Sequence, residues 1–218
     1  MGIGAWEEVP QGDLMIIATP HVGIVLYDWA IHFKVLQPPC NFNIISNRGL
    51  PIDRARCDLV EQARALGATK LFFLDSDVKL PPDGLVRLYY HNMPVVAAIY
   101  GSKHQTPGVW VEGQEADKKA RYTPVDPNSL NSVNLFTHDK IVIGMGSCLI
   151  DMKVFDRLEK PYFKWTQGIE DNGISEDFYF CEKLREKDIP IFVDTSIRCG
   201  HLDFSELDWI GNRNRLAS

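Results

Sequence analysis

The sequence has no hydrophobic segment long enough to cross a membrane. Its longest apolar runs, such as Leu14 to Pro20 and Pro94 to Tyr100, are about seven residues long, whereas a membrane-spanning helix needs roughly 20. The first residues, MGIGAWEEVPQGD, contain neither a basic segment nor a long apolar segment, so no signal peptide is predicted. We therefore expect a soluble, cytoplasmic protein without a transmembrane segment.

Basic clusters and cysteine pairs are lacking as well. The 23 Lys and Arg residues are outnumbered by 29 Asp and Glu residues, and no more than two basic residues are adjacent, which argues against a nucleic-acid partner. The five cysteines are widely spaced and form no CxxC pair, a pattern that favours reduced, mostly buried thiols over a disulfide framework. The net charge of −6 indicates a small or neutral partner.

What the sequence does contain is an alternation of short apolar runs and helical patterns, within a length of 218 residues that suits one domain. Strands are predicted over 14–19, 43–46, 70–74, 95–100, 140–143, 148–150 and 191–194, and helices over 53–66, 83–91, 153–158 and 175–187. Such alternation is typical of an α/β layered fold with a largely parallel central sheet flanked by helices.

The capping residues and the middle of the chain add detail to this prediction. Asp53 and Ser175 are expected to cap the N-termini of their helices, and Gly67 is expected to end the first of them. The segment from Gly101 to Asp139 has three prolines and no sustained period. We interpret it as a long loop that either covers a site or forms a surface insertion.

The run Asp75-Ser76-Asp77 directly follows the predicted strand 70–74. Ligands of open α/β sheets bind beyond the carboxyl ends of the strands, so both carboxylates are expected to face a cleft there. Carboxylate oxygens suit Mg²⁺ or Mn²⁺, and such a cation would neutralise a diphosphate. The alternative is that the two aspartates only end the strand and form the following turn.

Two further groups are candidates for chemistry. Glu176 and Asp177 lie in the first turn of a predicted helix, where acids also stabilise the helix dipole without any other function. His201 follows a predicted strand in the run Cys199-Gly200-His201, where it is either a ligand or a structural histidine.

Taken together, these motifs resemble glycosyltransferases of the GT-A fold, in particular the small family 2 type of prokaryotes and their viruses. The likeness rests on four segments in this order, LFFLDSDV, IVIGMGSCLI, GISEDFYFCEKL and TSIRCGHL, and it extends from Leu14 to His201. The resemblance implies a Rossmann-like nucleotide-diphospho-sugar transferase fold. The chain would form a single catalytic domain over residues 1–218, with a nucleotide-binding part at about 14–100 and an acceptor or catalytic part at about 101–203.

The resemblance also implies roles for individual residues. A UDP- or GDP-sugar donor would lie against Thr19, Pro20, His21, Arg54, Asp75, Ser76, Gly144 and Gly146. A divalent cation, Mn²⁺ or Mg²⁺, would be held by Asp77 and His201, with Asp75 contacting the ribose or reaching the metal through water. Glu176 and Asp177 would form the acceptor site, with Asp177 as the general base. Lys103, His104 and Trp110 would be contacts of a covering loop.

Other functions remain open from the sequence. A nucleotidyltransferase also places carboxylates and metal beside a nucleotide, but the segment TPHVGIVLYDW after the first strand lacks the Lys or Arg that such enzymes use to grip a triphosphate. A non-catalytic nucleotide-sugar binding module would keep the same fold. The acceptor and the choice between inversion and retention are not indicated by any motif.

Overall fold

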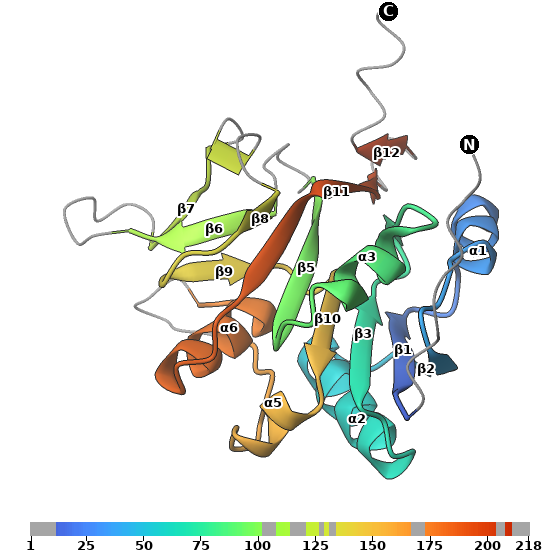
Figure 1. The fold of residues 1–218 in the computed structure, drawn as a ribbon, viewed down its shortest axis with the longest axis horizontal. Coiled ribbons are helices and arrows are strands. Elements are labelled where there is room, and N and C mark those ends of the chain that lie inside the picture. The colour runs from blue at the N-terminus through green and yellow to red at the C-terminus, as the bar shows by residue number, and fades with distance from the viewer. Residues whose placement is uncertain are drawn as a thin grey trace, which may run out of the picture.

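The computed structural model describes residues 12–101, 108–113, 121–126, 129–130, 134–166, 173–203 and 208–210. Its centre is a twisted sheet in the order β12-β11-β5-β10-β3-β1-β2, with β4 and β8 also paired to β11 (Figure 1). The strands of this sheet are β1 (Leu14–His21), β2 (Asn41–Arg48), β3 (Lys70–Leu74), β4 (Val78–Lys79), β5 (Val95–Tyr100), β8 (Leu135–Phe136), β10 (Ser147–Asp151), β11 (Phe192–Asp203) and β12 (Asp208–Ile210).

The sheet is mostly parallel along its main path. β2 pairs with β1, β1 with β3, and β11 with β5 in the parallel sense, which confirms the predicted α/β fold. β10 lies between β3 and β5 and runs antiparallel to both. Because β10 is reversed, its first residue reaches the edge of the sheet at which β3 and β5 end.

Helices cover both faces of the sheet. One face packs against α2 (Ile52–Ala65), α5 (Lys153–Asp156) and α6 (Glu176–Glu186), and the other packs against α1 (Tyr27–Lys34) and α3 (Gly84–Tyr90). Alternate residues of β1 point to opposite faces of the sheet. Ile16 and Ala18 lie in the core beneath α2, α5 and α6, and Met15 and Ile17 lie in the core beneath α1 and α3. The continuous apolar runs of β1, β3 and β5 are therefore explained by burial on both sides.

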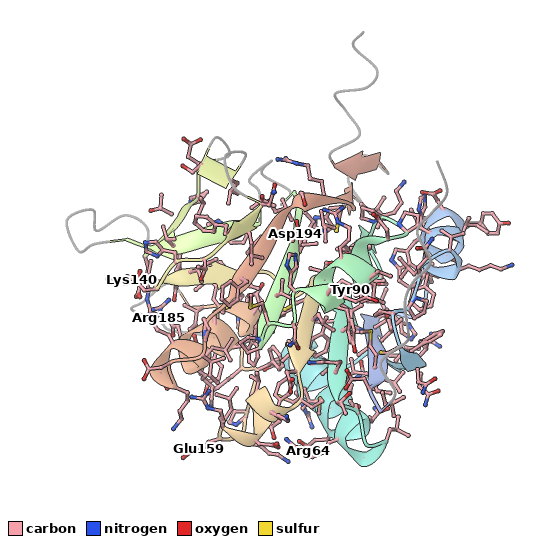
Figure 2. The ribbon with its side chains drawn as sticks, in the orientation of Figure 1. Arg64, Tyr90, Lys140, Glu159, Arg185 and Asp194 are labelled. Atoms are coloured by element: carbon pink, nitrogen blue, oxygen red, sulfur yellow. The ribbon has the colours of Figure 1, made fainter. Side chains whose placement is uncertain are left out.

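A small second sheet, in the order β7-β6-β9, packs beside α6 (Figure 1). Its strands are β6 (Val109–Glu112), β7 (Tyr122–Pro124) and β9 (Ile141–Ile143). Arg185 near the end of α6 donates to Glu112 of β6 at 2.6 Å, which ties the small sheet to the helix (Figure 2). The expectation that residues 101–139 form an irregular loop is thus wrong for the parts that contain β6, β7 and β8, whose runs are too short to show a period.

Most predicted elements are found within a few residues of their predicted bounds, and β3 and β5 coincide with them. The predicted caps differ in part. Pro51 is the N-cap residue of α2, with Asp53 inside the first turn, whereas Ser175 is the N-cap residue of α6 and Gly67 follows α2 with a φ of 75°. α1 and the extension of β11 beyond Asp194 were not expected.

Two expectations from composition are confirmed. All five cysteines are free, and each is buried except Cys57, which is partly buried. Within the described residues, none of the helices has the length and apolar character needed to span a bilayer.

Candidate active site

The candidate site lies at the edge where the parallel strands end. β1 ends at His21, β3 at Leu74 and β5 at Tyr100, and the reversed β10 begins there at Ser147. β11 passes the same edge, because His201 pairs with Val78 just beyond β3. Three of the segments that carry the sequence motifs are therefore brought together by the topology of the sheet, and the fourth forms α6.

The turn after β3 is fixed by hydrogen bonds of its backbone. The Asp75 amide donates to the Gly146 carbonyl at 3.0 Å, and the Asp77 carbonyl accepts from the Leu202 amide at 2.8 Å. The Trp29 indole N–H of α1 donates to the Asp75 and Val78 carbonyls at 3.1 and 2.9 Å. The backbone of the turn, from which the Asp75 and Asp77 side chains project, is thus held by neighbours on three sides.

A buried arginine, Arg56 of α2, connects two of the predicted acids. Its guanidinium donates to both carboxylate oxygens of Asp75 at 3.0 and 2.9 Å, and its Nε donates to Glu176 at 3.1 Å. Arg56 is 3% exposed and lies over the Phe73 ring at 5.2 Å. Burial alone would lower its pKa, but the charges of Asp75 and Glu176 outweigh burial and raise it. Charge-assisted bonds of this kind are about twice as strong as neutral ones.

Arg54, the arginine predicted at the nucleotide, lies elsewhere on the same helix. Its side chain is exposed and borders a surface hollow that Asp53 and Phe163 also line. Arg56 is the arginine that faces the carboxylates. The sequence did hold a signal for it, because Arg56 precedes Leu59 and Val60 by three and four residues and so shares their buried face.

Asp77 and His201 lie next to each other. The His201 Nδ1 is 2.7 Å from the Gly101 carbonyl, which can only accept, so Nδ1 carries the hydrogen. The other ring nitrogen, Nε2, faces the Asp77 carboxylate 3.4 Å away: the neutral ring offers its lone pair there to a cation, whereas the protonated ring donates its second hydrogen to Asp77. Burial lowers the pKa of His201, but the hydrogen bond and charge of Asp77 outweigh it, so the pKa is raised.

This arrangement fits a divalent cation. Two lone-pair donors face each other, and the other imidazole nitrogen is fixed by a carbonyl, as in many metal-binding histidines. Within the described residues no three His, Cys, Asp or Glu side chains gather closely enough to form a metal site by themselves. With these two described side chains alone, a cation would need further oxygen ligands, such as phosphate and water, to complete its coordination.

The acids at the start of α6 have different surroundings. Glu176 is buried against Arg56, whereas Asp177 is partly buried and accepts from the Ser175 hydroxyl and the Phe178 amide. The Ser175 side chain bonds Asp177 rather than capping the helix. Burial, together with the charge of Glu176, raises the pKa of Asp177 to about 6.

Gly144 and Gly146 are needed for close packing against Tyr100. An added Cβ at Gly144 would lie 1.9 Å from the Tyr100 hydroxyl, and one at Gly146 would lie 3.1 Å from it. The Tyr100 oxygen accepts from the Gly146 amide at 3.1 Å, and its ring meets the His201 ring edge-on at 5.3 Å. The glycines thus bring the start of β10 against a partly buried tyrosine beside His201, a role that the sequence did not reveal.

The other predicted nucleotide-contacting residues lie along the same edge. Thr19 and Pro20 are buried at the end of β1, and the Thr19 hydroxyl has no hydrogen-bond partner within the described residues. His21 is partly exposed and accepts from the Gly23 amide, while Ser76 is half-buried in the turn after β3.

Of the residues predicted for a covering loop, Lys103 and His104 lie outside the described residues. Trp110 is on β6, where its ring packs against Phe178 of α6 at 5.2 Å. This contact places β6 against the helix that carries Glu176 and Asp177.

The fold matches that of A197 from STIV. The two chains superpose with a TM-score of 0.57 at 17% identity, over 90% of this chain and 92% of that one. Structures of UDP-glucose pyrophosphorylase, apo and complexed with UDP-glucose, are more distant. They reach a TM-score of 0.43 at 9% and 8% identity, over 88% of this chain and about three quarters of theirs. No family model and no curated protein sequence matches the chain.

Proposed function

We propose that the protein is a metal-dependent glycosyltransferase that moves a sugar from a nucleotide-diphosphate donor to an acceptor hydroxyl. The observation that carries the proposal is the pairing of Asp77 with an oriented His201 at the carboxyl edge of the sheet, at the same edge as a carboxylate, Asp177, whose pKa is raised to about 6. This combination would provide both a position for a cation and a carboxylate that can accept a proton, as the transfer reaction requires.

Asp77 and His201 are the proposed protein ligands of a Mn²⁺ or Mg²⁺ ion. When bound, the cation supplies Lewis-acid stabilisation of the negative charge that develops on the departing diphosphate. Asp75 is proposed to act differently, because both of its oxygens already accept from Arg56. Its role would be contact with the ribose or an indirect contact with the cation through water.

Asp177 is the proposed general base. It would accept the proton of the acceptor hydroxyl as that oxygen bonds the anomeric carbon and the bond to the diphosphate breaks. A carboxylate with a pKa of about 6 is a stronger base than an ordinary aspartate and is still mostly ionised at pH 7. Glu176 is proposed to line the acceptor side, held by Arg56.

The donor is proposed to lie along the ends of β1 and β3. Thr19, Pro20 and His21 would contact the base and ribose together with Ser76, and the backbone at Gly144 and Gly146 would border the sugar. Arg54 would contact the nucleotide only from the outer side of α2, because it is exposed there. Residues 14–100 would then form the nucleotide-binding part and 101–203 the acceptor part.

Calorimetric titration with UDP and GDP, each with and without Mn²⁺, tests the proposal directly. We expect at least one nucleotide diphosphate to bind, and to bind more tightly with the metal. If neither nucleotide binds in the presence of Mn²⁺ or Mg²⁺, the proposed donor class is wrong.

Three variants separate the proposed roles. Asp77→Ala and His201→Ala should each weaken metal-dependent nucleotide binding about tenfold or more, whereas Asp177→Asn should keep binding and lose transfer. His138→Ala is the matched control, because His138 also lies 3.0 Å from an aspartate, Asp139, but is exposed and away from the site. Full transfer activity in Asp177→Asn would show that Asp177 is not the base.

A further inference from the structure

Exposed apolar side chains are concentrated in one stretch of the chain. Among the described residues, nine of the twelve large hydrophobic side chains that are exposed fall between positions 22 and 50. They are Val22, Ile24, Val25, Tyr27, Ile31, Val35, Phe42, Ile44 and Leu50. Single exposed apolar residues are ordinary on protein surfaces, whereas several that gather on one face are typical of an interaction site.

We call five of these side chains the apolar ridge because they lie on α1, at its C-cap or in the segment just before it: Val22, Ile24, Tyr27, Ile31 and Val35. Tyr27, Ile31 and Val35 follow one another at intervals of four residues, so they share one face of α1 and its C-cap. Val22, Ile24 and Tyr27 are 77, 80 and 81% exposed, which means that they project from the surface rather than line a groove.

The fold does not require this outer face to be apolar. α1 is held by its opposite face, where Trp29 is buried and stacks on Phe33 at 5.1 Å. The Trp29 indole bonds the turn after β3, so α1 is firmly attached to the candidate site. Figure 1 shows α1 at the margin of the molecule, beyond β1 and β2.

The charges around the ridge point to the nature of the partner. Residues 22–50 contain two basic residues, Lys34 and Arg48, and one acid, Asp28, a net charge of +1 on a chain of net charge −6. Asp28 is paired with Lys79 at 3.2 Å. Lys34 is exposed and lies three residues after Ile31, on the ridge face of α1, while the Arg48 guanidinium lies against Gly23.

We propose that the apolar ridge docks on an anionic lipid surface. Projecting aliphatic side chains, an interfacial tyrosine and flanking basic residues are the features with which peripheral proteins insert shallowly between lipid headgroups. A second copy of the chain fits less well. A stable dimer interface needs about 1,200 Å² or more of closely packed surface, and side chains that project singly from a short helix and a loop do not provide it.

Vesicle co-sedimentation tests this proposal without nucleotide or metal, so its outcome does not depend on the proposed transfer reaction. We expect the protein to sediment with vesicles of phosphatidylcholine containing 30% phosphatidylglycerol, and much less with phosphatidylcholine alone. Binding should weaken as NaCl is added, because surface charges are screened.

Variants assign the binding to the ridge. Ile24→Ser combined with Tyr27→Ser should lower vesicle partitioning at least about tenfold, and Lys34→Glu should lower it by a similar factor. The matched control is Leu66→Ser with Trp165→Ser, which also removes one exposed aliphatic and one exposed aromatic side chain but at the end of α2 and after α5. All these positions are exposed, so circular dichroism should show unchanged folding.

Three results would overturn the proposal. They are no sedimentation of the wild-type protein with anionic vesicles, equal losses in the ridge and control variants, and self-association in analytical ultracentrifugation that the ridge variant abolishes. The last would show that a second copy occupies the ridge.

Discussion

Three aspartates of the candidate site have three different neighbours. Asp75 is held by the two guanidinium nitrogens of Arg56, Asp77 faces the Nε2 of His201, and Asp177 bonds the Ser175 hydroxyl and its own helix. The three aspartates therefore differ in their chemistry, because their neighbours determine which carboxylate oxygens remain available to a ligand. Sequence spacing alone cannot distinguish them.

Replacing Asp177 with Asn should change stability in a pH-dependent way. A raised carboxyl pKa means that the folded state binds the proton more tightly, so this group disfavours folding increasingly as the pH rises from about 4 to about 6. We expect Asp177→Asn to increase the free energy of unfolding by about 1–3 kcal/mol at pH 8 and to have little effect at pH 4. Urea denaturation at both pH values measures the difference. Equal effects at the two pH values would contradict the raised pKa.

Removing Arg56 should be costly, because it leaves Asp75 and Glu176 without their shared cation. Arg56→Met is expected to lower the free energy of unfolding by about 2–4 kcal/mol at pH 8, a value reduced by the partial exposure of Asp75. Denaturation curves of this variant and of the triple variant with Asp75→Asn and Glu176→Gln test the account, since the triple variant should recover most of the loss.

Arg64→Met provides the control for that measurement. Arg64 pairs with Asp156 on the surface, and exposed pairs contribute under about 1 kcal/mol (Figure 2). If Arg56→Met were no more destabilising than Arg64→Met, the buried connection between α2 and α6 would not matter to the fold.

At the scale of elements, α1 holds the turn that carries Asp75 and Asp77 in place. The Trp29 indole N–H bonds two carbonyls of the turn, and Asp28 of the same helix pairs with Lys79 directly after it. The same helix therefore has an inner face that fixes the site and an outer face that forms the apolar ridge.

Trp29→Phe should weaken the attachment of α1 to the turn after β3 while keeping an aromatic ring in the core. Loss of the two hydrogen bonds is expected to cost about 1–2 kcal/mol of stability. Because the turn is less well held, metal-dependent nucleotide affinity should fall about threefold to tenfold. Trp165→Phe, at an exposed tryptophan, is the control and should change neither quantity. Unchanged nucleotide affinity in Trp29→Phe would show that α1 does not position the turn.

The sequence was sufficient for the elements whose pattern is local. The runs at 70–74 and 95–100 are apolar throughout because both faces of β3 and β5 are buried, and this requirement is visible residue by residue. α1 was not predicted because apolar residues occur on both of its faces, which removes the amphipathic period. β11 was underestimated because its register shifts between Asp194 and Arg198, where the pattern is interrupted.

The candidate site was predictable in its acids and its histidine but not in their connections. Asp75, Asp77 and His201 stood out because they follow predicted strands, and Glu176 and Asp177 because they lie in the first turn of a predicted helix. Arg56 and Tyr100 act through contacts between positions far apart in the chain, and such contacts are set by the packing of the sheet. The resemblance pointed to Arg54 alone, and Arg56 was not considered, because a likeness of motifs does not fix the rotation of a helix.

At the scale of the whole molecule, the two halves of the chain each contribute one proposed cation ligand. Asp77 follows β3 and His201 lies on β11, and β4 and β11 pair at Val78 and His201. A bound cation would therefore link the early and the late part of the chain.

This link should be visible in thermal unfolding. Mn²⁺ alone is expected to raise the Tm little, because the described residues supply only two close ligands, whereas Mn²⁺ with UDP or GDP at about 100 times its Kd should stabilise the protein by about 2.7 kcal/mol. A thermal scan of the wild-type and His201→Ala proteins measures this, and the variant should lose the effect. Strong stabilisation by Mn²⁺ alone would indicate a site with more protein ligands.

The position of β10 has a consequence for how the chain is made. β3 and β5 are joined only through β10, which comes some fifty residues after β5 along the sequence. A growing chain that has reached Tyr100 thus carries two apolar strands with unpaired edges, one on β3 and both on β5, until residues 147–151 leave the ribosome and pair with β3 and β5. During that interval we expect the nascent protein to need protection from aggregation, since β3 and β5 are not connected until β10 pairs with both.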